Sequence, residues 1–364
     1  MLRFRLETRL FTAHEACPTH GEHRPYWRRE MEKVTLANDE QRKPRKGLAT
    51  QIMHSRETGI IGALVIMVVL LSIFAPDFAS KGNLLNDARN LSFIGIVVLG
   101  QAAVMITGGI DLSVGSVWGL AAVASAAMMQ AGMGVVPACA LTLLICAAVG
   151  FFNGFCVTKL RMLPFVPTLA TMSIARALAL IITRGKAIDG FRPDGDPFFQ
   201  LGGGDFLDLP VPFIIFVVLA VIAGIVLKRT VYGRQLYAVG GNERAAMLTG
   251  LNVDRLKMSV YIMSSVLAGV AGIIEVSYLS SAISNQGLGK ELSVIAAAVI
   301  GGTALSGGEG TVIGVFVGTV ILEVLRNGLV LLGTDAYWQG VFVGSVIVLA
   351  VFIDQLRKGV WRRR

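Results

Sequence analysis

The chain has 364 residues, of which 54% are hydrophobic and only 16% are charged, and its mean hydropathy is +0.66. Soluble domains carry about a quarter charged residues, so this composition excludes one and indicates an integral membrane protein. The formal net charge of +9 comes mainly from the N-terminal tail, a loop near residue 240 and the C-terminus. That distribution indicates membrane topology and contact with lipid headgroups, and we expect no nucleic-acid partner.

Histidine and cysteine positions limit the chemistry available within the membrane. All four histidines precede the first long hydrophobic run, so none can act there as a base or metal ligand. The four cysteines form no CxxC pair and are expected to be free apolar residues. His14, Cys17, His20 and His23 recur every third residue, but we attribute this spacing to chance. The sequence therefore predicts neither a metal site nor a catalytic residue.

Composition divides the chain into three regions. Residues 1–57 are polar and aperiodic, and we expect a disordered cytoplasmic tail. A start assigned too early is a second interpretation, because Met31 and Met53 could each begin a working chain. The tail lacks an apolar stretch followed by a small-residue cleavage site, so the first hydrophobic run should remain as an anchor. Residues 58–355 are predicted to form the transmembrane domain, and 356–364 a basic cytoplasmic tail.

Ten hydrophobic runs approach the roughly 20 apolar residues that a membrane-spanning helix needs. They lie at 59–75, 91–107, 113–131, 135–157, 165–183, 210–227, 257–280, 290–306, 311–332 and 338–354. The predicted fold class is therefore an all-α integral membrane protein with about ten transmembrane helices. Eight spans with re-entrant pieces fit nearly as well, because only a few residues separate 290–306 from 311–332.

The charges of the loops predict the orientation of these spans. With a cytoplasmic N-terminus, the basic residues at 159–161, at 228–257 and at the C-terminus all fall in the cytoplasm. The acidic loop at 184–209 then lies outside it. The positive-inside rule thus places both termini in the cytoplasm, which requires an even number of spans.

A basic segment at 230–257 contains a short predicted helix. Asn242 is suited to cap it, Glu243 lies at the positive end of its dipole, and Gly250 ends it. Adjacent alanines and flanking glycines leave little side-chain bulk, so another protein can approach the backbone closely. An ordinary amphipathic loop is the alternative. The candidate contact residues are Gly240, Gly241, Asn242, Glu243, Ala245, Ala246 and Gly250.

Glycine and polar residues break the hydrophobic runs around residue 111, in the stretch GGIDLSVGSV at 108–117. Irregular backbone at membrane depth is tolerated only where protein or water covers it. Asp111 or Ser113 is expected to cap the following helix, whose N–H groups could also face a polar ligand. Capping alone and a role in translocation explain Asp111 equally well. The spacing G-G-x-x-L-S-x-G recurs at 301–308, which points to an old internal repeat.

Hydroxyl and ionisable side chains mark other runs. Thr168, Thr171 and Ser173 can offer hydroxyls to a pore or to neighbouring helices. Arg176 and Glu275 are costly in lipid and must face protein, water or a partner, which allows a pair between them. The candidate translocation residues are Asp111, Ser113, Thr168, Thr171, Ser173, Arg176 and Glu275.

The segment at 240–250 resembles the coupling helix of ATP-binding-cassette permeases. GGIDLSVGSV, the segment 164–176 and the stretch 289–328 are similar to the ribose-type sugar branch of that family, and the resemblance covers about 59–354. It implies a permease subunit of the bacterial inner membrane, paired with a second copy, that receives a monosaccharide from an extracytoplasmic binding protein. It also implies a separate ATPase subunit that holds ATP and Mg²⁺, with no cofactor on this chain. The sequence has no G-x-x-x-x-G-K-[ST] motif, so it cannot cradle ATP phosphates itself.

Other functions stay open at this level. An ion-coupled secondary transporter would use Asp111 and Glu275 as proton or Na⁺ sites. A non-transporting membrane scaffold is another alternative. Within the cassette family, the alternative substrates are a branched-chain amino acid or a nucleoside.

Overall fold

The computed structural model describes residues 56–191 and 197–334, and after these residues 338, 340–342, 344, 345, 348 and 352. All of them belong to one compact unit that begins at His54. The predicted N-terminal tail, except for its last two residues, lies outside the described part, as does the basic tail at 356–364. The histidine and cysteine spacing at 14–23 lies outside it too.

Helices dominate the described residues, and six of them are long and apolar enough to cross a membrane. The six are α5 (Lys81–Ile106), α7 (Val135–Thr158), α8 (Phe165–Thr183), α10 (Val211–Arg229), α13 (Val253–Leu279) and α15 (Val312–Leu331). Two further apolar helices have fewer than 18 residues by this measure: Thr58–Phe74, which is part of α4 (Arg56–Phe74), and α6 (Val114–Gln130). The predicted all-α membrane architecture is confirmed in these helices.

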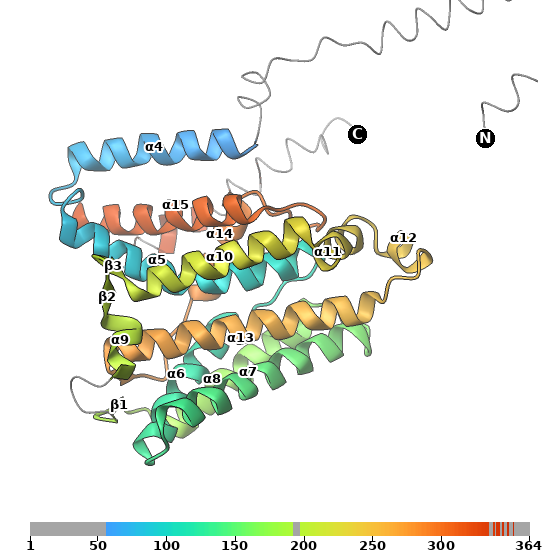
Figure 1. The fold of residues 1–364 in the computed structure, drawn as a ribbon, viewed down its shortest axis with the longest axis horizontal. Helices are drawn as coiled ribbons and strands as arrows, with labels where there is room; N and C mark the ends of the chain where they lie inside the picture. The colour runs from blue at the N-terminus through green and yellow to red at the C-terminus, as the bar shows by residue number, and fades with distance from the viewer. Residues whose placement is uncertain are drawn as a thin grey trace, which may run out of the picture. The chain divides into compact units, whose positions relative to one another are not determined.

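The remaining elements are short, and the strands and most of the short helices lie near the ends of the long helices (Figure 1). The short helices are α9 (Pro197–Gly203), α11 (Val231–Gly241), α12 (Glu243–Leu248) and α14 (Lys290–Ile300). The strands are β1 (Ile188–Asp189), β2 (Asp205–Phe206), β3 (Leu209–Pro210) and β4 (Ser281–Ala282). They form two antiparallel pairs, β1 with β4 and β2 with β3.

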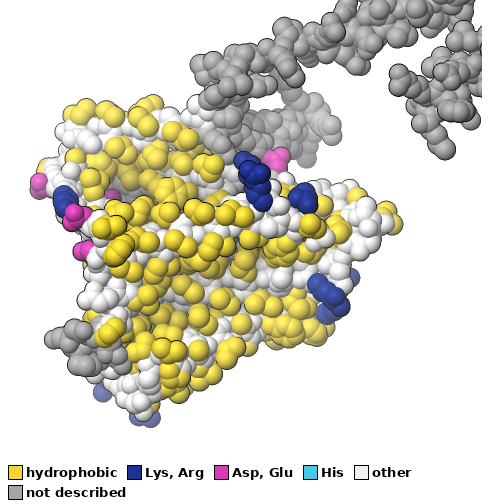
Figure 2. Space-filling model, viewed as in Figure 1, with side chains coloured by type: hydrophobic (Ala, Val, Ile, Leu, Met, Phe, Trp, Pro, Cys, Tyr) yellow, Lys and Arg dark blue, Asp and Glu magenta, His cyan; other side chains and the backbone are white. Residues whose placement is uncertain are grey.

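The long helices run side by side, with α13 among α5, α6 and α7 (Figure 1). On the other side of α5, helix α15 packs against α4 and α14. The strands and α9 gather at one end of the helices, and α11 and α12 at the opposite end. Hydrophobic side chains cover the surface between the two ends, while most charged groups in this view lie at the ends (Figure 2). This distribution matches a protein surrounded by lipid along its middle.

The hydrophobic run at 290–306 does not form a spanning helix, so this part of the ten-span prediction is wrong. Helix α14 has 11 residues, about 16 Å of length against the ~30 Å of a bilayer core. It ends at Ile300 because the next residues are glycines, and Gly302, Gly307 and Gly308 all have positive φ. Within the described part of the chain, the short α14 fits the re-entrant piece of the alternative with eight spans.

Helix α5 begins ten residues before the run at 91–107 that predicted it, because polar residues also belong to this helix. Ser80 caps it by accepting a hydrogen bond from the Asn83 backbone N–H. The Arg89 guanidinium lies 2.7 Å from an Asp205 carboxylate oxygen and 5.0 Å from the centre of the Tyr278 ring. These partners explain how the charged first half of α5 stays folded beside the apolar second half.

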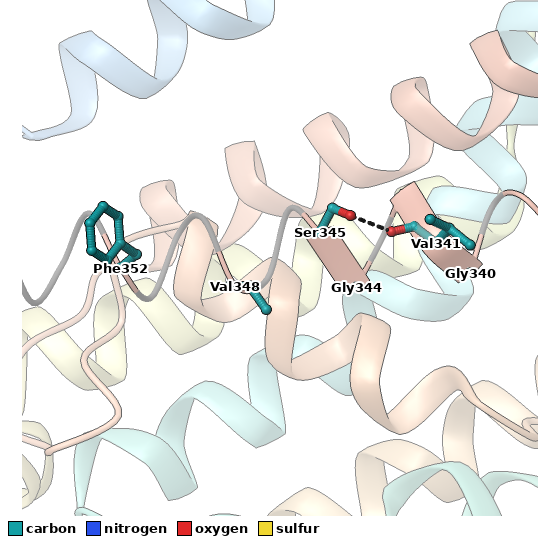
Figure 3. A pocket seen from close by; sticks show the side chains of 6 residues that line it. All are labelled: Gly340, Val341, Gly344, Ser345, Val348 and Phe352. Carbon is teal, nitrogen blue, oxygen red and sulfur yellow. Dashed lines mark hydrogen bonds between the residues drawn. The ribbon is translucent and has the colours of Figure 1, made fainter.

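The last predicted run, 338–354, is described only at scattered positions. Six of these residues line an open, apolar hollow of about 560 Å³ (Figure 3): Gly340, Val341, Gly344, Ser345, Val348 and Phe352. None of the predicted site residues lies there, so this hollow is separate from the candidate site.

Glycine allows the central helices to approach one another closely. A Cβ at Gly150 of α7 would lie 2.5 Å from the Tyr261 carbonyl oxygen of α13. A Cβ at Gly100 of α5 would lie 2.8 Å from the Cα of Ser264, which also belongs to α13. In lipid, such contacts hold helices together by packing, since apolar burial gives little driving force there. Helix α13 is therefore fixed on two sides by backbone contact.

We predict that Gly150→Ala destabilises the protein by roughly 1–3 kcal/mol, because the added methyl group overpacks the contact between α7 and α13. Gly62→Ala on α4 is the control, since a Cβ there meets nothing within 4 Å. Thermal unfolding of both variants in the same detergent checks the prediction. Equal unfolding midpoints for the two variants would contradict it.

Candidate functional site

The predicted break near residue 111 is present between α5, which ends at Ile106, and α6, which begins at Val114. Asp111 is fully buried, and its Oδ1 accepts hydrogen bonds from the Ser113 backbone N–H at 2.9 Å and hydroxyl at 2.6 Å. Asp111 therefore holds the turn that leads into α6. Ser113 occupies the N-cap position but makes no side-chain cap bond, because its hydroxyl bonds to Asp111 instead.

A buried chain of hydrogen bonds extends from Asp111 to two neighbouring helices. The Asn153 side chain of α7 donates to the Ser113 hydroxyl oxygen at 3.0 Å. Its carbonyl oxygen accepts from the Thr171 hydroxyl of α8 at 2.6 Å. The structure thus brings Asp111, Ser113 and Thr171 together through Asn153. The sequence analysis did not single out Asn153, although an amide within the apolar run 135–157 is a signal for such a role.

Two of the predicted hydroxyl residues do not join this chain. Thr168 donates to the Pro164 carbonyl of its own helix at 2.8 Å. Ser173 donates to the Leu169 carbonyl at 3.3 Å, and its side chain is on the exposed face of α8. Residues two apart on a helix point in very different directions, which explains why Thr171 is buried and Ser173 is not.

Glu275 and Arg176 lie closer to the end of the helices that carries the strands. The Glu275 carboxylate accepts from the Trp118 indole N–H at 2.7 Å and from the Gln286 amide at 2.6 Å. Arg176 donates to the backbone carbonyls of Ser284 and Gln286, both at 2.8 Å. Among its described contacts none is with Glu275, so the two residues meet through Gln286 and do not form the direct pair that the sequence allows. Together they tie α6, α8 and α13 to the loop at 281–289.

A third polar cluster, between α5 and α15, escaped the sequence analysis. Asn327 donates to the Asn83 side chain at 2.9 Å and to the Asp87 carboxylate. The buried Glu323 lies on α15, one turn before Asn327, and its carboxylate is 3.9 Å from the Arg326 guanidinium group. Glu323 and Arg326 stand within the apolar run 311–332, so charged residues in that run were the available signal.

The short helix expected near residue 245 is present as α12. Its N-cap is Asn242, as predicted, because the side-chain oxygen accepts from the Ala245 backbone N–H at 3.0 Å. Gly250 adopts φ +83 two residues after the helix ends. Gly240 and Gly241, however, form the last turn of α11 and not part of this helix.

The exposed face of α12 differs from the one expected. Ala246 is only 4% exposed and packs with α11 and α13, so it cannot present a bare backbone to another protein. Ala245 is exposed, and Leu248 is 89% exposed at the end of the helix. Leu248 and its neighbour Met247, which is also exposed, therefore give the helix an apolar tip.

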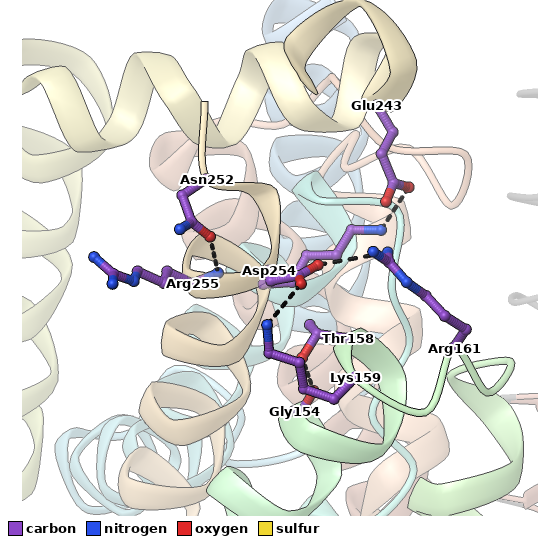
Figure 4. Close-up of polar contacts among 9 residues, drawn as sticks. Gly154, Thr158, Lys159, Arg161, Glu243, Asn252, Asp254 and Arg255 are labelled. Carbon is purple, nitrogen blue, oxygen red and sulfur yellow. Dashed lines mark hydrogen bonds and ion pairs between the residues drawn. The ribbon is translucent and has the colours of Figure 1, made fainter. Parts of the chain in front are cut away.

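Ion pairs fix α12 and the start of α13 (Figure 4). Glu243 of α12 lies 2.7 Å from the Lys257 ammonium group of α13. Asp254 of α13 lies 3.0 Å from Lys159 and 3.4 Å from Arg161, both of which follow α7. Ion pairs at a protein surface each contribute about 1 kcal/mol or less, and these pairs, each with one half-buried partner, mainly fix position. Beside them is an open pocket of about 360 Å³, lined by Arg161, Met247, Gly250, Leu251, Asn252, Val253 and Asp254.

We predict that Asn153→Leu destabilises the protein, because it leaves the buried Thr171 hydroxyl without its hydrogen-bond partner and removes the bond that the Ser113 hydroxyl accepts. A buried hydroxyl without a partner costs about 1–3 kcal/mol. Ser173→Ala serves as the control, because it removes an exposed hydroxyl that bonds only within its own helix. Thermal unfolding in detergent checks the difference, and a smaller effect of Asn153→Leu than of Ser173→Ala would contradict it.

Comparison with known proteins gives a consistent family. The model of the family described as branched-chain amino acid transport system / permease component matches residues 83–351. Ribose import permease protein RbsC of Bacillus subtilis (strain 168) is 42% identical over 296 residues, 81% of this chain and 92% of the relative. RbsC of Escherichia coli (strain K12) is 39% identical over 297 residues, with the same coverage. No solved structure matches the chain.

A relative named for another sugar is also similar. L-arabinose ABC transporter permease protein AraH of Azospirillum brasilense is 34% identical over 302 residues, 83% of this chain and 88% of the relative. A permease component carries no catalytic step or cofactor of its own, and it implies ATPase and binding-protein partners. The chain therefore belongs to the family of multi-pass membrane permeases of bacterial ATP-binding-cassette importers, in its ribose- and arabinose-type sugar branch.

Proposed function

We propose that the chain forms the membrane path for a pentose, with D-ribose as the first candidate, that an extracytoplasmic binding protein delivers. The observation that carries this proposal is the 39–42% identity to permeases named for ribose over four fifths of the chain. L-Arabinose is the second candidate because of its own named relative. Family membership removes the ion-coupled transporter and the scaffold as alternatives.

The end of the helices that carries α12 is proposed to face the cytoplasm. Lysine and arginine outnumber acidic residues there, and the positive-inside rule associates such an excess with the cytoplasmic side. The basic residues are Lys159, Arg161, Lys228, Arg229, Arg234, Arg244, Arg255 and Lys257, and the acidic ones are Glu243, Asp254 and Glu309. Both chain termini are proposed to lie on this side as well.

Helix α12 is proposed to dock on the ATPase subunit. Its apolar tip, Leu248 and Met247, stands beside the open pocket next to Asp254, and a partner can fill the pocket while it covers the tip. The ion pair of Glu243 with Lys257 holds the helix on α13, and the pairs of Asp254 hold the start of α13 to the residues that follow α7. A force on α12 is therefore applied directly to a helix that runs through the centre of the protein.

The sugar path is proposed to pass the two internal polar clusters, one around Asp111 and one around Glu275. Asp111 Oδ1 takes both bonds from Ser113 in the turn, and the Ser264 side chain is a further polar neighbour of this buried carboxyl group. Such a group favours a function beyond capping. Thr171, Arg176 and Glu275 supply further donors and acceptors for sugar hydroxyls, while Thr168 and Ser173 contribute less because they bond within their own helix.

The transport cycle is proposed to be alternating access in a pair of identical permease chains. Closure of the ATPase pair on ATP moves α12 and the helices on either side of it, and the path opens toward the loaded binding protein. Hydrolysis of ATP returns the path to its resting state. The affinity of the path for the sugar can be weak, because the binding protein supplies selectivity.

We predict that Leu248→Asp prevents productive docking of the ATPase, because it places a charge at the centre of an apolar contact. Leu207→Asp is the matched control: Leu207 is 81% exposed, but it lies in the turn between β2 and β3 at the opposite end. Co-purification with the ATPase and ATP hydrolysis by the assembled complex are measured. Normal assembly with Leu248→Asp would contradict the docking proposal.

The substrate is tested with the complete importer in vesicles, supplied with its ATPase and binding protein. We expect ATP-dependent uptake of labelled D-ribose that excess L-arabinose reduces and excess L-leucine leaves unchanged. An ionophore should have no effect while ATP is held constant. Uptake of labelled L-leucine without uptake of either pentose would contradict the proposal.

A further inference from the structure

Two glycine-rich loops meet at the end of the helices that carries α12. The first loop, 107–113, joins α5 to α6, and the second, 301–311, joins α14 to α15. The Gly308 backbone N–H donates to the Ile106 carbonyl oxygen at 2.9 Å. A Cβ at Gly307 would lie 2.9 Å from the Gly108 nitrogen. The two loops, which share the G-G-x-x-L-S spacing, therefore pack backbone against backbone.

The helix before α12 contacts the second loop. The Tyr237 hydroxyl of α11 donates to the Gly310 carbonyl oxygen at 2.7 Å. One turn further, Gly240 lies so close to the Ile106 carbonyl and the Gly308 nitrogen that a Cβ would overlap them. The last turn of α11 thus lies directly on the junction of the two loops.

The helix after α12 contacts the first loop. The Tyr261 hydroxyl of α13 lies 3.5 Å from the Ile110 carbonyl oxygen, to which it donates. A Cβ at Gly109 would lie 2.6 Å from the same hydroxyl. Tyr261 is buried, so solvent does not compete for this contact.

We propose that Tyr237 and Tyr261 are positioning residues that transmit displacement of α12 to the two glycine-rich loops. This inference rests on the proposed docking of α12 on the ATPase. Helix α12 is short and lies between α11 and α13, so a push on it displaces one or both of these helices. The Tyr237 hydroxyl bonds α11 to the second loop, and the Tyr261 hydroxyl bonds α13 to the first. Because packed interiors have low compressibility, the displacement arrives at both breaks in the membrane helices.

The chemistry of the two contacts suits this role. A phenol donates one directed hydrogen bond to a carbonyl oxygen that no helix partner satisfies. A phenol is protonated at neutral pH, and burial raises the pKa of the Tyr237 hydroxyl further above its ordinary value. The receiving loops contain glycines with positive φ, which can change conformation at low cost.

The test removes single hydroxyl groups from the full chain in its complex with ATPase and binding protein. Tyr237→Phe and Tyr261→Phe each keep the ring and lose the hydrogen bond to a loop. Tyr232→Phe is the matched control, because Tyr232 is also half-buried on α11 but its hydroxyl bonds to Ser259 of α13 at 2.7 Å. The double variant Tyr237→Phe/Tyr261→Phe removes both links.

The first measurement is D-ribose uptake per ATP hydrolysed. We expect Tyr237→Phe to lower this ratio roughly three- to tenfold, the range of one ordinary hydrogen bond, with normal assembly of the complex. The double variant should lower it further, and Tyr232→Phe should match the native chain. Equal ratios for Tyr237→Phe and Tyr232→Phe would overturn the proposal. The proposal would also be overturned if uptake fell only in proportion to the amount of assembled complex, because the tyrosines would then have only a structural role.

The second measurement needs no sugar, which separates this inference from the proposed substrate. Hydrogen–deuterium exchange at 301–311 is followed in the assembled complex with and without ATP. We expect an ATP-dependent change in the native chain and in Tyr232→Phe, and loss of that change in Tyr237→Phe. A native complex that shows the change but takes up no ribose overturns the substrate alone. An unaltered change in Tyr237→Phe overturns the transmission role.

Discussion

The constraint on which the structure depends is that backbone polar groups need partners wherever water is absent. Helices meet this need internally, but the loops at 107–113 and 301–311 are not helical. They satisfy part of it through each other, as the bond from Gly308 to the Ile106 carbonyl illustrates. Only glycine permits this approach, and the same close contact places α11 and α13 against the loops.

Helix α13 connects the two ends of the protein. One end is fixed by ion pairs beside α12, its middle packs on α5 and α7 through glycines, and Glu275 near its other end accepts bonds from Trp118 and Gln286. The buried chain from Asp111 to Thr171 lies beside it and joins α6, α7 and α8. A partner at one end of the protein can therefore act on polar groups far from its docking surface.

Much of the fold can be predicted from the sequence, because each membrane-spanning helix needs its own run of about 20 apolar residues. Hydrophobic length predicted the long helices, and the short cap sequence at Asn242 predicted α12. The run at 290–306 misled, because hydropathy counts glycine as neutral while its backbone conformation ends α14 at Ile300. The burial of Ala246 and the hydrogen bonds of Asn153 depend on contacts between segments that are distant in the sequence. The spacing of residues along one helix does not reveal such contacts.

The most direct test of this account is the separation of the Ile106 carbonyl oxygen and the Gly308 nitrogen in the permease–ATPase complex. Cryo-electron microscopy of the complex with and without a non-hydrolysable ATP analogue would measure it. The account predicts that α11, α12 and both loops move together, so that the 2.9 Å contact is kept in both states. Movement of α12 with the loops left in place, or separation of the loops from each other, would contradict it.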